Sequence, residues 1–106
     1  MRSLRNPSRR PTHPGALLRA DVLPALNMTQ TELARRLGVS RLSVSKLLLE
    51  ERALSPEMAA RVAKLLYTTA ESWLRMQAAV DLWELGQHPE RLATVQPIDK
   101  RLVRAA

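Results

Sequence analysis

The residues whose spacing suggests chemistry lie in the segment QTELARRLGVSRLSVSKL, residues 30–47. Arg41, Leu42, Ser45 and Lys46 recur at intervals that place them on one face of a short helix. If the other face of that helix is buried, these four side chains point away from the core. A short helix with exposed basic and hydroxyl groups fits the major groove of DNA.

Catalytic chemistry has little support in the sequence. The two histidines, His13 and His88, lie in proline-containing polar segments without obvious acid or nucleophile partners. The chain has no cysteine, and we find no glycine-rich phosphate loop and no metal-ligand spacing. We therefore expect a protein that is not an enzyme and that needs no cofactor or metal.

Composition and charge narrow the class of partner. The 106 residues suit a single domain, and 17 basic against 10 acidic residues give a net charge of +7. This charge favours a polyanionic partner but does not by itself distinguish DNA, RNA and an anionic membrane. We also find neither a signal-peptide pattern nor an apolar run of membrane-spanning length, so we expect a cytoplasmic protein.

Local signals predict two short helices joined by a tight turn. Thr29 and Glu32 form a capping box, Gly38 suits a left-handed helix end, and Ser40 can cap the next helix. Ala34 allows the two helices to approach closely. The apolar residues expected to fill the angle between them are Leu33, Leu37, Val39, Val44 and Leu47. This joint pattern predicts a helix-turn-helix; an ordinary helical hairpin is the alternative.

The remaining segments complete an all-α prediction of five helices. The first helix begins at Gly15 and is stopped or kinked by Pro24, and Ser55-Pro56-Glu57 signals a later start. The last helix runs from about Thr69 to Leu85. We expect a flexible basic arm at residues 1–14, a helix-turn-helix domain at 15–85, and a polar tail at 86–106 with a possible short strand at 93–98.

Over roughly residues 11–85 the chain resembles the Cro/C1-type helix-turn-helix family, and within it the HigA-type antitoxins of bacterial toxin–antitoxin modules. The strings that carry this resemblance, besides residues 30–47, are Pro11-Thr12-His13-Pro14-Gly15 and Trp73-Leu74-x-x-Gln77-x-Ala79-x-Asp81-Leu82-Trp83. Ala16 stands where the family often has Glu, and Glu50-Glu51 where it often has an Asn-Gly turn. The resemblance implies a lambda-repressor-like fold.

The resemblance also implies roles for individual residues. The expected contacts to DNA bases come from Arg41, Leu42, Ser45 and Lys46. The expected contacts to the DNA backbone come from Gln30, Ser40 and Arg52. For each of these residues the alternative is an ordinary solvated surface position.

The last predicted helix suggests a homodimer without any family knowledge, because it carries two apolar stripes on nearly opposite sides. One stripe consists of Trp73, Met76, Val80 and Trp83. The other consists of Leu74, Ala78, Leu82 and Leu85. One stripe can reach the core, and the other would stay wet in a monomer unless the tail folds back over it. The candidate interface residues are Trp73, Leu74, Met76, Val80, Leu82 and Trp83, because the sequence does not say which stripe faces the core.

Two functions remain open. The first is an antitoxin that neutralises a HigB-type toxin related to the RelE ribonucleases and represses its own operon at a palindromic DNA site. The second is a stand-alone helix-turn-helix transcriptional regulator without a toxin. Only the resemblance supports the toxin, and a small basic reading frame directly upstream would favour the antitoxin.

Overall fold

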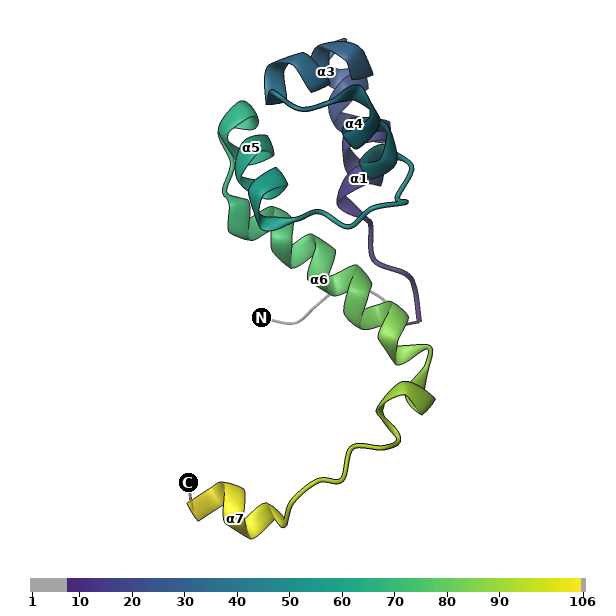
Figure 1. Ribbon diagram of the computed structural model, residues 1–106, viewed down its shortest axis with the longest axis vertical. Helices are drawn as coiled ribbons and strands as arrows, with labels where there is room; N and C mark the ends of the chain where they lie inside the picture. The colour runs from purple at the N-terminus through teal and green to yellow at the C-terminus, as the bar shows by residue number, and fades with distance from the viewer. Residues whose placement is uncertain (1–7, 106) are drawn as a thin grey trace.

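The computed structural model describes residues 8–105, a chain of helices without a strand among those residues (Figure 1). The predicted all-α class is confirmed. The elements in chain order are α1 (Pro14–Leu17), η1 (Leu18–Val22), α2 (Leu23–Leu26), α3 (Gln30–Leu37), α4 (Arg41–Leu48), α5 (Pro56–Leu66), α6 (Ala70–Gly86), η2 (Pro89–Leu92) and α7 (Lys100–Ala105).

The first helix continues through Pro24 instead of stopping there. It consists of α1, a single wider π-helical stretch (η1) and α2, and it ends at Asn27 in the left-handed conformation with φ 49°. In η1 the N–H of Leu23 donates to the carbonyl of Leu18, five residues earlier. Proline lacks an N–H and its ring crowds the carbonyl four residues back, so a wider turn before Pro24 lets the helix continue.

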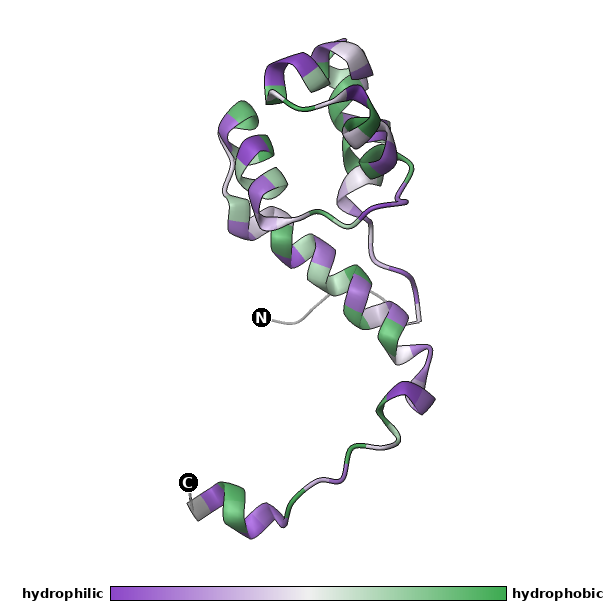
Figure 2. Ribbon diagram, viewed as in Figure 1, coloured by the Kyte–Doolittle hydropathy of each residue, from purple (hydrophilic) through white to green (hydrophobic). Residues whose placement is uncertain are grey.

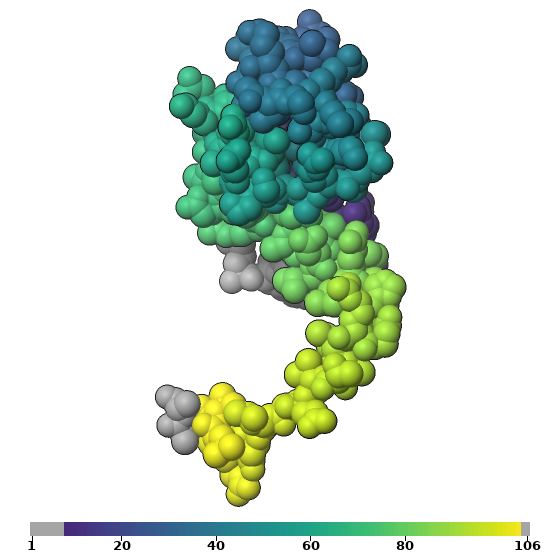
Figure 3. Space-filling view, in the orientation of Figure 1, coloured from purple at the N-terminus to yellow at the C-terminus, as the bar shows by residue number. Residues whose placement is uncertain are grey.

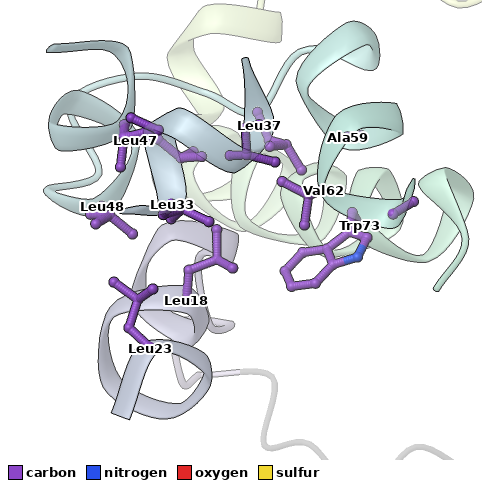
Figure 4. Close-up of a cluster of buried hydrophobic side chains, with 13 residues drawn as sticks. Leu18, Leu23, Leu33, Leu37, Leu47, Leu48, Ala59, Val62 and Trp73 are labelled. Carbon is purple, nitrogen blue, oxygen red and sulfur yellow. The ribbon is translucent and has the colours of Figure 1, made fainter. Parts of the chain in front are cut away.

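The core lies where α1, η1, α3, α4, α5 and the start of α6 meet (Figure 4). Leu18, Val44, Leu48 and Val62 are fully buried there, and Trp73 of α6 closes one side. The α1 and α4 backbones approach closely at Gly15, where a Cβ would lie only 1.9 Å from the carbonyl oxygen of Leu47. Only glycine fits this contact, which sets the position of α4 relative to the first helix.

The folded domain begins earlier in the chain than the predicted boundary at residue 15. Pro11, His13 and Pro14 are buried, and the Nδ1 atom of His13 caps α1 by accepting the N–H of Gly15 at 2.9 Å. Arg10 forms ion pairs with two other parts of the chain. These contacts assign residues 10–14 to the folded domain. Residues 1–7 of the predicted arm, which include Arg2 and Arg5, lie outside the described residues.

The tail leads away from the domain (Figures 1 and 3). The molecule measures 55 × 29 × 27 Å and its radius of gyration is 17.5 Å, whereas a compact chain of this length has a radius of gyration of about 13 Å. The strand predicted at residues 93–98 is wrong, because these residues lie in no regular element between η2 and α7. A strand is stable only beside another, and the described residues offer no second strand.

Candidate nucleic-acid interface

Helices α3 and α4 begin at the predicted caps. The Thr29 hydroxyl accepts the N–H of Glu32 at 3.1 Å, and the Ser40 hydroxyl accepts the N–H of Ser43 at 3.0 Å. The Glu32 carboxylate accepts a hydrogen bond from Arg36 at 3.0 Å, and among the described contacts it does not bond back to the N–H of Thr29, so only half of the predicted capping box forms. Gly38 ends α3 with φ +72°, the left-handed conformation that the sequence predicts.

The contact between α3 and α4 is apolar, as the spacing predicts. Ala34, Leu37 and Leu47 are buried between the helices, and Val39 in the turn is half-buried. Burial of these side chains holds α4 by its inner face. The outer face is therefore free to meet a partner.

The outer face of α4 carries the four residues expected to read bases. Arg41 is exposed, Leu42 is 64% exposed, and Ser45 and Lys46 are half-buried. Neither Arg41 nor Lys46 forms an ion pair with another described residue. Their charges and donors are thus available to an anionic or carbonyl-rich ligand such as the edge of a guanine.

The three expected backbone contacts differ in their surroundings. Gln30 is half-buried at the first turn of α3. The Ser40 hydroxyl is already used in capping α4 and also donates to Ser43 Oγ at 2.9 Å. Arg52 is held at the same end of α4, because its Nη1 donates to Ser43 Oγ at 3.3 Å. No sequence pattern predicts this role of Ser43, which positions the Arg52 cation near the positive end of the helix.

In the turn after α4 a glutamate adopts the left-handed backbone conformation that usually belongs to glycine. Glu50 has φ +63°, and the N–H groups of Glu50 and Glu51 donate to the carbonyls of Leu47 and Lys46 at 3.0 and 2.9 Å. This pair of bonds is a Schellman motif, which usually has glycine at the left-handed position. The C-terminal cap that an Asn-Gly turn would supply is therefore formed here by Glu50-Glu51, with a glutamate in a strained conformation.

Two arginines neutralise Glu50. Its carboxylate lies 2.9 Å from Arg10 and 3.4 Å from Arg19, and the hydrogen bond from Arg10 is the main reason that the pKa of Glu50 is lowered. Arg10 also reaches Glu84 of α6 at 3.0 Å. The Arg10 guanidinium thus links the turn after α4 to α6. The sequence does not predict this link, because 40 positions separate Arg10 from Glu50 and 74 separate it from Glu84.

A second link to α6 comes from a buried amide. The Oε1 atom of Gln77 accepts the N–H of Leu54 at 2.8 Å, and its Nε2 donates to Asp81 at 2.9 Å. Leu54 belongs to the loop between α4 and α5, residues 49–55. Gln77 is therefore a positioning residue for the segment that carries Arg52.

Comparisons with known proteins agree with this geometry. The family described as "Helix-turn-helix" matches residues 18–72, from η1 to the first turn of α6. The chain belongs to the Cro/C1-type helix-turn-helix family. It is 40% identical to the Escherichia coli K12 protein YbaQ, named an uncharacterized helix-turn-helix transcriptional regulator, over 95% of this chain and 92% of YbaQ.

Antitoxins also resemble this helix-turn-helix protein over nearly its full length. Antitoxin HigA-1 of Vibrio cholerae serotype O1 is 34% identical, over 97% of this chain and 98% of HigA-1. The structure of antitoxin GraA in complex with its operator superposes with a TM-score of 0.77 at 36% identity, covering 92% of this chain and 99% of GraA. These relatives are regulators and antitoxins, in agreement with the prediction that the chain is not an enzyme.

The surroundings of α6 decide which of its stripes meets the core. Trp73 is 5% exposed and Val80 is 1% exposed, so both lie inside the domain and leave no surface for a partner. Met76 and Trp83 of the same stripe are half-buried, and the Trp83 Nε1 is a buried donor without a recorded acceptor. Leu82 of the other stripe is 68% exposed.

Among the described residues no helix is both long and apolar enough to cross a bilayer. In the same part of the chain, His, Asp and Glu side chains form no cluster of three that could hold a metal ion.

Proposed function

We propose that this protein is a repressor that binds operator DNA in the major groove through α4. The observation that carries the proposal is the unpaired Arg41 and Lys46 on the outer face of a helix whose inner face is buried. In this proposal Arg41, Leu42, Ser45 and Lys46 contact bases. Gln30, Ser40 and Arg52 contact the phosphate backbone, and the GraA structure with its operator supports this kind of ligand.

The proposed repressor acts as a homodimer joined through α6. A helix with two apolar stripes needs burial on both, and the domain covers the stripe that carries Trp73 and Val80. On the other stripe only Leu74 packs against the core, whereas Ala78 and Leu82 stay exposed. The interface is then the opposite stripe, with Leu74, Leu82 and the neighbouring Ala78 and Leu85. A two-fold dimer places two copies of α4 about one turn of DNA apart, which fits a palindromic operator.

We further propose that the repressor is an antitoxin. HigA-1 supports this, because it matches nearly the whole chain and not only the DNA-binding segment. The partner would be a HigB-type toxin related to the RelE ribonucleases, encoded beside this protein. Both operator binding and toxin neutralisation would take place in the cytoplasm, where the DNA and the ribonuclease's substrate are.

A mobility-shift assay with the protein's own promoter tests DNA recognition. We expect affinity to fall steeply with salt, with a log–log slope of about −0.9 for each phosphate neutralised. Arg41→Ala should cost about 1–3 kcal/mol on the operator and relax the preference at one base pair. Arg91→Ala, which removes an exposed arginine far from α4, is the matched control. Equal affinity for promoter and scrambled DNA would refute sequence-specific binding.

The second candidate is a stand-alone regulator, and the resemblance to YbaQ favours it. Co-expression separates the two functions. The adjacent small reading frame is expressed with and without this protein, and growth is measured. Rescue of a growth defect supports the antitoxin, whereas operator binding without any rescue supports the regulator.

A further inference from the structure

The C-terminal tail carries apolar side chains that its own domain does not cover. Among the described residues, half of the ten large apolar side chains that are strongly exposed lie in this tail. They are Leu92, Val95, Ile98, Leu102 and Val103, each between 54% and 64% exposed. Figure 2 shows hydrophobic residues in α7, on a segment that Figures 1 and 3 place away from every other helix.

The α7 helix also needs support from outside its own sequence. It has six residues, whereas isolated helices shorter than about 12 residues are marginal in water. Its apolar residues, Leu102 and Val103, lie between Lys100 and Arg101 on one side and Arg104 on the other, and Arg101 pairs with Asp99 at 2.8 Å. Helix α7 is therefore a short, basic, amphipathic element that would gain stability by docking on an apolar surface with negative charge.

The domain presents such a surface beside α6. A groove of about 340 Å³ runs between the segment before α1, the first helix and α6, and it is lined by Pro11, Thr12, Leu17, Asp21, Met76 and Ala79. Apolar side chains form much of the lining. Asp21 is exposed and forms no ion pair with another described residue, so its carboxylate is available to a cation.

We propose that α7 of one subunit docks into this groove of a second copy of the chain. Leu102 and Val103 enter the apolar part of the groove, and Lys100 and Arg104 of α7 face Asp21. The inference rests on the proposed dimer through α6 and extends it, because Ala79 of the groove lies one helical turn from Leu82 of the dimer stripe. The two surfaces form one continuous interface.

The geometry of a two-fold dimer favours the second copy over the chain's own groove. When two copies of α6 pair antiparallel, the C-terminal end of one helix lies beside the N-terminal half of the other. The tail leaves α6 at its C-terminal end and continues away from its own domain. It thus starts beside the partner's groove.

Paired substitutions test the contribution of the tail. Replacing both Leu102 and Val103 by Ser should raise the dimer dissociation constant by about tenfold or more, because two apolar side chains lose their burial. Analytical ultracentrifugation on dilution measures this constant. Leu26→Ser is the matched control, since Leu26 is 50% exposed on α2, away from the groove. The tail makes no core contact, so the double variant keeps its fold, and an unchanged constant overturns the proposal.

A cross-link identifies the occupant of the groove. The chain has no cysteine, so a variant with both Thr12→Cys and Leu102→Cys contains the only two thiols. After mild oxidation we expect a covalent dimer on a non-reducing gel, and no such band from a variant with Glu57→Cys and Leu102→Cys. An internal disulfide at monomer mass, or no disulfide, overturns docking on a second copy. Light scattering of the unmodified protein tests the dimer separately: a monomer refutes both proposals, whereas a dimer insensitive to the tail refutes only this one.

Discussion

Replacing Gly15 by alanine tests the closest contact in the domain. A Cβ at this position would lie 1.9 Å from the carbonyl oxygen of Leu47 and 2.8 Å from its carbonyl carbon. Both are backbone atoms of α4, which cannot rotate away as a flexible side chain can. To restore an ordinary contact of 3.4 Å, α1 and α4 must separate by about 1.5 Å.

Two opposing effects set the expected change in the free energy of unfolding. Alanine in a helix is favoured over glycine by about 1 kcal/mol. Overpacking a core costs about 1–3 kcal/mol, and a clash between two backbones belongs at the upper end. The expected result is a net loss of about 2 kcal/mol. With a urea dependence of about 1–3 kcal/mol per molar, the unfolding midpoint should fall by about 1 M.

Urea unfolding followed by circular dichroism measures this loss. Gly86→Ala is the matched control, because a Cβ on Gly86, the last residue of α6, meets no atom within 4 Å. The control should be unchanged or slightly more stable. The separation should also tilt α4, so operator affinity should fall in the Gly15 variant. If the two variants were equally stable, the reasoning about the contact between α1 and α4 would be refuted.

Three further predictions concern the buried side of the domain, the proposed dimer stripe and the strained turn after α4. Leu82→Glu should give a folded monomer in light scattering, whereas Val80→Glu should unfold the domain in circular dichroism, because only the second charge is buried. Burial lowers the pKa of His13 below its ordinary value of 6.5, so the unfolded chain takes up a proton first as the pH falls. The free energy of unfolding should therefore have its full value above about pH 6.5 and decrease as the pH falls below it. His13→Asn, which keeps a capping side chain, should weaken this decrease. Urea midpoints measured from pH 7.5 to 5 check both expectations. Glu50→Ala should be less stable than Glu50→Gly by about 1 kcal/mol, because both lose the carboxylate and only alanine keeps the strain of φ +63°. Equal urea unfolding midpoints for the two variants would show that the turn is not strained.

The sequence alone determined the starts of the helices and the helix-turn-helix. Thr29, Ser40 and Ser55 each cap the helix that the sequence predicts, and Gly38 ends α3 as expected. These signals are readable because a cap joins groups only three residues apart, so neighbouring residues contain the whole interaction. The same holds for the outer face of α4, which follows from helical periodicity once one face is apolar.

The tertiary structure decided everything that depends on distant parts of the chain. Periodicity found both stripes of α6, but only the packed domain shows that Trp73 and Val80 belong to its core. The bond from Leu54 to Gln77 spans 23 positions, and the ion pair of Arg10 with Glu50 spans 40. Such partners meet only when the helices pack, and no local pattern records which distant partner a polar side chain will find. The tail likewise reads as polar in sequence, and only the fold shows that the domain does not cover its apolar side chains.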